Sequence, residues 1–225
     1  MRVLNFEQIN LEPGYDIMSV QSYIDHIEKS LDLAERCVSK CTPEILAMEG
    51  MSGTFTRHFY NNLLNTEDAR YLEVGAWKGS SSCSALSGNK ATVTVIDNWS
   101  EFGGPKDECV TSIGKAAGDN NVEIIDHDSF SIDLATLGKY NMYLYDGCHK
   151  RESHEKALTY FQDVLDDVFI YVCDDWNWNF VRDGTFDAIH GLGLTVEYEN
   201  ARFTHANGTR DTWWNGISIF VLRKP

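Results

Sequence analysis

An acidic residue stands at the end of each of five short apolar runs between residues 70 and 176. The acids are Glu73, Asp97, the Asp126–Asp128 segment, Asp146 and the pair Asp174–Asp175. If the runs are strands of an open parallel sheet, these acids gather around one site, because ligands bind beyond the carboxyl ends of such strands. Carboxylates that share a site can bind a cation or hold hydroxyl groups.

Two neighbouring runs predict the sharpest cluster. The predicted strand at residues 141–145 is followed by Asp146 and His149, and the one at 169–173 is followed by Asp174 and Asp175. Three carboxylates that converge repel one another unless a cation or a proton separates them. Their oxygen atoms suit Mg²⁺ or Ca²⁺, so we expect Asp146, Asp174 and Asp175 to be metal ligands. The alternative is that an acid of the pair only caps the following loop.

His149 has three interpretations. Its pKa near neutrality suits a general base that acts with Asp146 on a hydroxyl group, which makes these two the candidate catalytic residues. It could instead be a further metal ligand, or it could orient the next helix. His154, one helical turn further along, is expected at the surface.

The segment Arg70–Cys83, RYLEVGAWKGSSSC, predicts a buried strand, a glycine turn and a helix that begins with serines. Asp97 follows about 20 residues later, where nucleotide-binding folds place an acid for ribose hydroxyls. The spacing departs from the G-x-G-x-x-G fingerprint of dinucleotide sites, because Trp77 stands where the second glycine should be and would crowd a pyrophosphate. A tight turn without a ligand is the structural alternative.

The pattern Glu73-x-Gly75-x-x-x-Gly79-Ser80 resembles motif I of class I S-adenosylmethionine (SAM) dependent methyltransferases, in a form common among small-molecule O-methyltransferases. The resemblance implies that SAM is the cofactor and that Glu73 faces its methionine amino group, directly or through water. The other cofactor contacts that it implies are Gly75, Ala76, Gly79, Ser80, Ser81, Asp97, Asn98, Trp99, Asp128, Ser129 and Asp146.

The acids after the two later strands resemble the metal site of catechol-type and macrolide-type O-methyltransferases. Asp146 matches the first acid of that site, and Asp174–Asp175 matches the pair, although catechol-type enzymes have asparagine where Asp175 stands. The loop Glu49–Thr54 resembles a stretch that closes over the methionine end of SAM in several class I enzymes. A plain connection between helices is an equal alternative for this loop.

Composition limits the classes of partner. The chain has 225 residues and a formal net charge of -15, which argues against nucleic acid and against an anionic membrane surface. The apolar runs are too short to cross a bilayer, and the first 16 residues carry no secretory pattern. Six cysteines without a CxxC pair are typical of a reducing compartment, so we expect a cytoplasmic protein.

The apolar periodicity predicts an amphipathic helix at residues 16–40, followed by helices at 43–48 and 54–64. Strands are expected at 70–74, 92–96, 122–125, 141–145, 168–173, 194–199 and 216–222, and further helices at 79–87, 105–117, 151–165 and 181–190. This alternation predicts an α/β fold with a mostly parallel sheet. The resemblance implies the Rossmann-like class I methyltransferase sheet with an antiparallel final strand, plus N-terminal helices.

We therefore expect an N-terminal helical extension at residues 1–50 and a SAM-binding domain at 51–225. The narrow apolar stripe of the first helix should pack on this domain or on a second copy, which would make a homo-oligomer. The expected activity is metal-assisted methylation of a hydroxyl on a small-molecule acceptor. The alternatives are an NAD(P)-dependent oxidoreductase, disfavoured by Trp77 and the missing third glycine, and a non-catalytic SAM-binding or assembly module.

Overall fold

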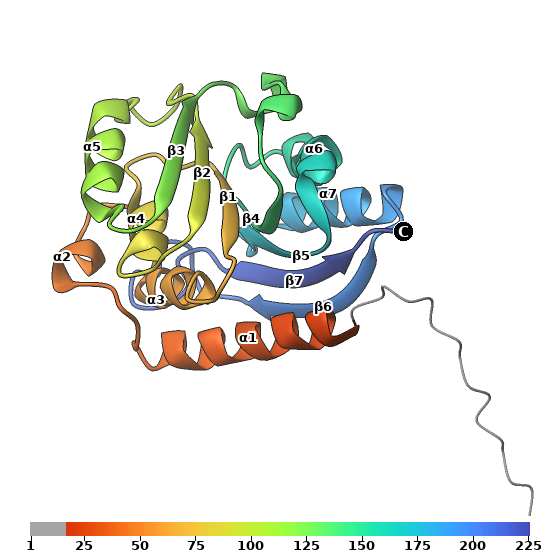
Figure 1. The fold of residues 1–225 in the computed structure, drawn as a ribbon, viewed down its shortest axis with the longest axis horizontal. Helices are drawn as coiled ribbons and strands as arrows, with labels where there is room; N and C mark the ends of the chain where they lie inside the picture. Colours follow the sequence, from red (N-terminus) through yellow and green to blue (C-terminus); the bar gives the residue numbers. More distant parts are fainter. Residues whose placement is uncertain (1–16) are drawn as a thin grey trace, which may run out of the picture.

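A computed structural model of the protein describes residues 17–225, which form a seven-stranded sheet with helices on both faces (Figure 1). The strand order is β3-β2-β1-β4-β5-β7-β6. Strands β1 to β5 pair in parallel, and β7 lies antiparallel between β5 and β6. The strands are β1 (Arg70–Val74), β2 (Thr92–Asp97), β3 (Asn121–Asp126), β4 (Tyr140–Tyr145), β5 (Leu165–Asp174), β6 (Thr195–Arg202) and β7 (Ile217–Arg223). The predicted mostly parallel sheet with an antiparallel final strand is confirmed.

The helices follow the predicted order. They are α1 (Ile17–Glu35), α2 (Pro43–Leu46), α3 (Thr54–Leu63), α4 (Ser80–Leu86), α5 (Lys106–Ala116), α6 (Arg151–Phe161) and α7 (Asn179–Gly191). Short 3-10 turns cover Ser129–Ser131, Leu134–Thr136 and Gln162–Val164. The prediction of one helix over 151–165 was too long, because the chain tightens into the last of these turns and Leu165 already begins β5.

The first helix is shorter than the predicted span of 16–40. It ends at Glu35, and Cys37 then adopts a left-handed backbone with φ of 55°, which turns the chain toward α2. Asp16 and the rest of the first 16 residues of the expected extension lie outside the described residues. The division of the chain at residue 50 stays a prediction.

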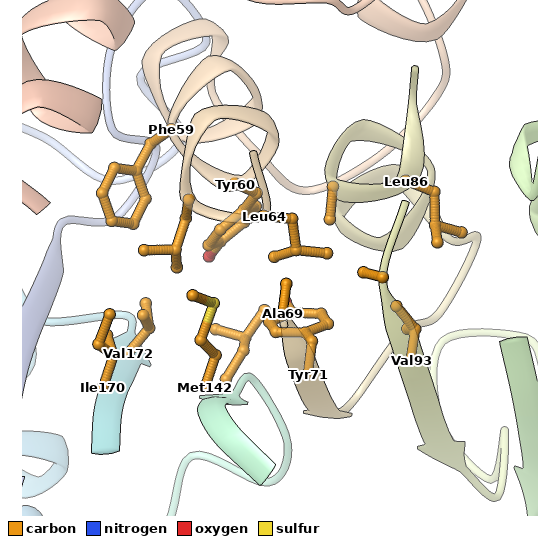
Figure 2. Close-up of a cluster of buried hydrophobic side chains, with 14 of the residues drawn as sticks. Phe59, Tyr60, Leu64, Ala69, Tyr71, Leu86, Val93, Met142, Ile170 and Val172 are labelled. Carbon is orange, nitrogen blue, oxygen red and sulfur yellow. The ribbon is translucent and has the colours of Figure 1, made fainter. Parts of the chain in front are cut away.

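Alternating side chains of the sheet supply two cores. In β4, Met142 and Leu144 face the cluster formed with α1, α3, α4 and α5, whereas Tyr143 and Tyr145 face the cluster formed with α6 and α7. Figure 2 shows the first cluster, where Phe59 and Tyr60 of α3 and Leu64 directly after it pack over the sheet. Both faces of β4 are buried, as expected for the central strand of a parallel sheet.

The apolar stripe of α1 is buried within its own chain. Ile27, Leu31 and Ala34 are at most 2% exposed and belong to the first core cluster. Glu35 at the end of the helix accepts a 2.7 Å hydrogen bond and ion pair from Arg202 of β6. A homo-oligomer stays a prediction. Within residues 17–225, no helix combines the length and the apolar character that crossing a membrane requires.

Candidate functional site

A cavity of about 330 Å³ opens at the carboxyl ends of β1, β2, β4 and β5. It lies at the point where the strand order reverses between β1 and β4, which is where open α/β sheets bind their ligands. Most of the predicted site residues line it: Gly75, Ala76, Ser80, Ser81, Asp97, Asn98, Trp99, Asp128, Ser129, Asp146, His149, Asp174 and Asp175. Glu73 and Gly79 are not part of the lining.

Gly75 makes the turn after β1 possible. Its φ of 92° is a conformation that L side chains rarely adopt, and an added Cβ would lie 2.0 Å from the carbonyl oxygen of Asp146. The turn therefore packs directly on the end of β4. Gly79, with φ of 83°, begins the turn into α4, where an added Cβ would meet Cys109 and Ile113 at 3.2 Å, so its role is packing rather than cavity lining.

Asp97 organises the rim of the cavity between β1 and β2. Its Oδ2 accepts hydrogen bonds from the backbone N–H groups of Ala76 at 2.8 Å and Trp77 at 2.9 Å, and its Oδ1 accepts one from Trp99 at 2.7 Å. Each carboxylate oxygen can accept more than one hydrogen bond, so a ribose hydroxyl could still bind. Asp97 thus both lines the cavity and holds the glycine turn in place.

The two tryptophans of this rim fasten its loops to each other. Trp99 Nε1 donates to the carbonyl of Trp77 at 2.8 Å, and Trp77 Nε1 donates to the carbonyl of Phe102 at 3.0 Å. These two hydrogen bonds tie the turn after β1 to the loop that follows β2. Further along the rim, Asp128 caps the turn that contains Ser129 by accepting from the N–H of Phe130 at 2.9 Å.

Glu73 lies beneath the cavity floor and is fully buried. Ser81, which does line the cavity, donates a 2.5 Å hydrogen bond to Glu73 Oε1. Glu73 Oε2 has no hydrogen-bond partner among the described residues, and burial raises the pKa of this carboxyl to about 7. Ser81 thus links Glu73 to the cavity, and the contact of Glu73 with the cofactor, directly or through water, stays a prediction.

Asp146, His149 and Asp175 form a cluster of possible metal ligands in the first cavity, which we call the corner. One ligand atom of each lies within 4.8 Å of the others, and His149 Nε2 is 2.7 Å from Asp175 Oδ2. Asn215, in the loop before β7, donates to Asp175 Oδ1 at 2.5 Å. Asp175 itself has a left-handed φ of 59°, which turns the chain sharply after β5 and aims its carboxylate into the cavity.

Asp174 lines the same cavity but is not in that group of three. It is 2% exposed, and its Oδ1 has no partner among residues 17–225. The pKa of Asp146 and that of Asp174 are both raised well above the usual range, first by burial and then by repulsion from neighbouring carboxylates. The two carboxylates and the imidazole of the corner are ligand types that fit a divalent cation.

The two histidines of this region differ from each other. His149 is part of the corner, with the ring of Trp178 packed edge-on at 4.8 Å between centroids. The prediction that His154 lies at the surface was wrong: it is 1% exposed, against Tyr145 and Cys173, and burial lowers its pKa to about 3. The pattern of α6 hid this, because α7 covers the face on which His154 lies.

Sequence reasoning missed Asn215 and Phe102, which also line the cavity. Both come from loops whose position depends on contacts far along the chain. The glycines beside them, Gly103 and Gly216, have positive φ and were the only local signal of sharp turns at these places.

Comparison with known proteins agrees with this geometry. Residues 72–176 match a family model described as a methyltransferase domain. An O-methyltransferase from Bacillus cereus, solved in complex with SAH, is similar with a TM-score of 0.56 and 14% identity, over 88% of this chain and 91% of that chain. Cofactor-bound Rv0187 from MTB gives a TM-score of 0.53 and 15% identity, over 91% of each chain. A search of curated proteins gives no match. At these identities the solved structures show the fold.

Proposed function

We propose that this chain is a class I SAM-dependent methyltransferase that methylates a hydroxyl group of a small molecule with the help of a divalent cation. The observation that carries the proposal is the corner of Asp146, His149 and Asp175, which shares one cavity with the glycine turn after β1. A net charge of -15 supports a small-molecule acceptor over nucleic acid. A cytoplasmic location stays a prediction.

The cofactor would occupy the side of the cavity between β1 and β2. Gly75 leaves the backbone open to a ligand, and Ser80 and Ser81 at the start of α4 present hydroxyl groups. Asp97 would bind the ribose hydroxyls, and Asp128 would border the adenine. The buried Glu73 favours a cationic group above Ser81, because its Oε2 has no partner among the described residues.

The acceptor would then lie against the acidic corner. Methyl transfer is an in-line displacement, so the protein must hold the acceptor oxygen near the sulfonium methyl and remove its proton. His149, held by Asp175 at 2.7 Å, is placed to accept that proton. A divalent cation held by Asp146 and Asp175 would lower the pKa of the acceptor hydroxyl. Its third ligand would be Asp174 when His149 serves as the base, and His149 otherwise.

Removal of divalent cations tests this proposal. The assay follows formation of S-adenosylhomocysteine (SAH) over a panel of dihydroxybenzenes and other hydroxylated acceptors. We expect EDTA to abolish turnover and Mg²⁺ to restore it, while the affinity for SAH, measured by calorimetry, stays the same. Undiminished turnover in EDTA would contradict the metal and leave His149 as the base.

A further inference from the structure

A second cavity, of about 410 Å³, lies behind one wall of the first. Ser52 and Trp214 line both cavities. The remaining lining of the second cavity consists of residues 46–50, Thr54, Arg57, Arg210 and Asp211. The two cavities therefore adjoin at the side chains of Ser52 and Trp214.

The start of α3 fixes the shape of this second cavity. The backbone N–H groups of Thr54 and Phe55 donate to the carbonyls of Arg210 at 2.7 Å and Thr212 at 3.1 Å. An added Cβ on Gly53 would lie 2.0 Å from the Thr212 carbonyl oxygen, so only glycine allows this approach. These contacts hold the backbone of Arg210 beside the first turn of α3, where Arg57 also lies.

Arg57 is a buried cation without an acidic partner among the described residues. It is 5% exposed; its Nη1 donates to the carbonyls of Ile45, Leu46 and Met48, and its Nε donates to Ser52. No hydrogen bond within residues 17–225 uses Nη2. Carbonyl oxygens satisfy the N–H groups but supply no net negative charge, so the cavity retains the positive charge of Arg57.

Arg210 adds a second positive charge to the lining of the second cavity. Its guanidinium forms no ion pair in the described part of the chain, and it lies close enough to Arg57 to lower the pKa of that group, after the larger effect of burial. Of the acids nearby, Glu49 is bound to Lys78 at 2.7 Å, and Asp211 lines the cavity without an ion pair to either arginine. Two arginines in the lining of one cavity are notable in a chain with 34 acidic and 19 basic residues.

We propose that Arg57 and Arg210 form a subsite for an anionic group, a carboxylate or a phosphate, carried by the methyl acceptor. This rests on the proposed function, which places the acceptor hydroxyl at the acidic corner of the first cavity. Arginine suits such groups because its planar fork offers several N–H donors to two oxygen atoms at once. An anion between the two guanidiniums would also relieve their mutual repulsion. The acceptor class is therefore a hydroxylated acid rather than a neutral alcohol.

The rival source of the anion is the carboxylate of the cofactor itself, so the test is made with the cofactor site filled. Inorganic phosphate is titrated by calorimetry into the protein saturated with SAH, at constant ionic strength. We expect saturable binding to the wild type and binding at least about tenfold weaker in Arg210→Gln, which loses a charge-assisted hydrogen bond. Arg210 uses only its backbone to hold α3, so this variant should fold. The matched control is Arg36→Gln, which removes an exposed arginine directly after α1 and should bind phosphate like the wild type.

Three outcomes would overturn the subsite: no phosphate binding to the wild type, equal binding to Arg210→Gln, or phosphate binding that disappears when SAH is bound. The last outcome would assign the two arginines to the cofactor. Failure of SAH itself to bind would instead contradict the proposed function, and phosphate titration of the free protein would still report on Arg210.

Discussion

The walls of the two cavities differ in how they are built and in the charge they carry. The strand-end wall consists of residues at the ends of β1, β2, β4 and β5 or directly after them: Gly75, Asp97, Asp146 and Asp175. The loop wall consists of residues 50–53 and 209–215, with Arg57 behind them. The first wall is acidic, and the second carries two arginines.

This difference separates what a sheet can position from what loops can position. Parallel strands bring their carboxyl ends to one edge, so the acids of the first wall converge through pairing in the sheet. The loop wall depends on glycine contacts and on backbone hydrogen bonds between residues more than 150 positions apart, such as Thr54 with Arg210. We expect the strand-end wall to carry the cofactor and the chemistry, and the loop wall to select the acceptor.

The largest effect is expected from removing one charge of the strand-end wall. Asp175→Asn keeps the shape of the side chain, and asparagine tolerates the left-handed φ of 59° at this position. Turnover should fall by about 10²–10⁴-fold, because His149 loses the carboxylate that lies 2.7 Å from its Nε2, whereas SAH affinity should not change. The control is Asp68→Asn, an exposed aspartate with a similar φ of 54° at the start of β1. Wild-type turnover in Asp175→Asn would remove this corner from the mechanism.

A clash of equal size placed in each wall gives a direct comparison. Gly75→Ala and Gly53→Ala each bring a Cβ to 2.0 Å from a carbonyl oxygen, that of Asp146 in one wall and of Thr212 in the other. We expect Gly75→Ala to weaken SAH binding by at least about tenfold more than Gly53→Ala, and to lower the free energy of unfolding by about 3 kcal/mol. Calorimetry and urea unfolding measure the two effects.

Gly193→Ala separates backbone strain from the clash. Gly193 has φ of 65° and no atom within 4 Å of an added Cβ, so this variant should cost only about 1 kcal/mol and leave SAH binding intact. Equal SAH affinities for Gly75→Ala and Gly53→Ala would show that the two walls do not divide the work as we describe.

A smaller effect should come from the carboxyl beneath the strand-end wall. Because burial raises the pKa of Glu73 from 4.5 to about 7, the folded state binds more protons than the unfolded state between these values, and stability falls as pH rises through this window. Glu73→Gln cannot ionise and should be more stable than the wild type at pH 8, by roughly 3 kcal/mol, and similar to it at pH 4. Urea unfolding of both proteins at the two pH values measures this; parallel pH profiles would contradict the raised pKa.

The difference between the strand-end wall and the loop wall also explains which features could be predicted from the sequence. The apolar runs and the acids after them predicted every strand, the sheet class and the strand-end acids that line the first cavity, because strand pairing alone brings those positions together. The role of Asn215 on Asp175 was not predictable, since it requires β7 to lie beside β5 with a particular turn at Gly216. The burial of His154 was missed because it depends on how α7 packs against α6, which no local pattern specifies.

Arg57 and Arg210 show the limit most clearly. They are 153 positions apart in the sequence, and neither stands in a recognisable motif. They face one cavity only because α3 begins against the carbonyls of the loop before β7.

The central claim is that the strand-end wall binds SAM rather than a dinucleotide. Titration calorimetry of the wild-type protein with SAH and, separately, with NAD tests it most directly. We predict one SAH bound per chain and no heat with NAD, because Trp77 stands where dinucleotide sites have their second glycine, and its Nε1 is bound to the carbonyl of Phe102 at 3.0 Å. Binding of NAD without binding of SAH would contradict the account.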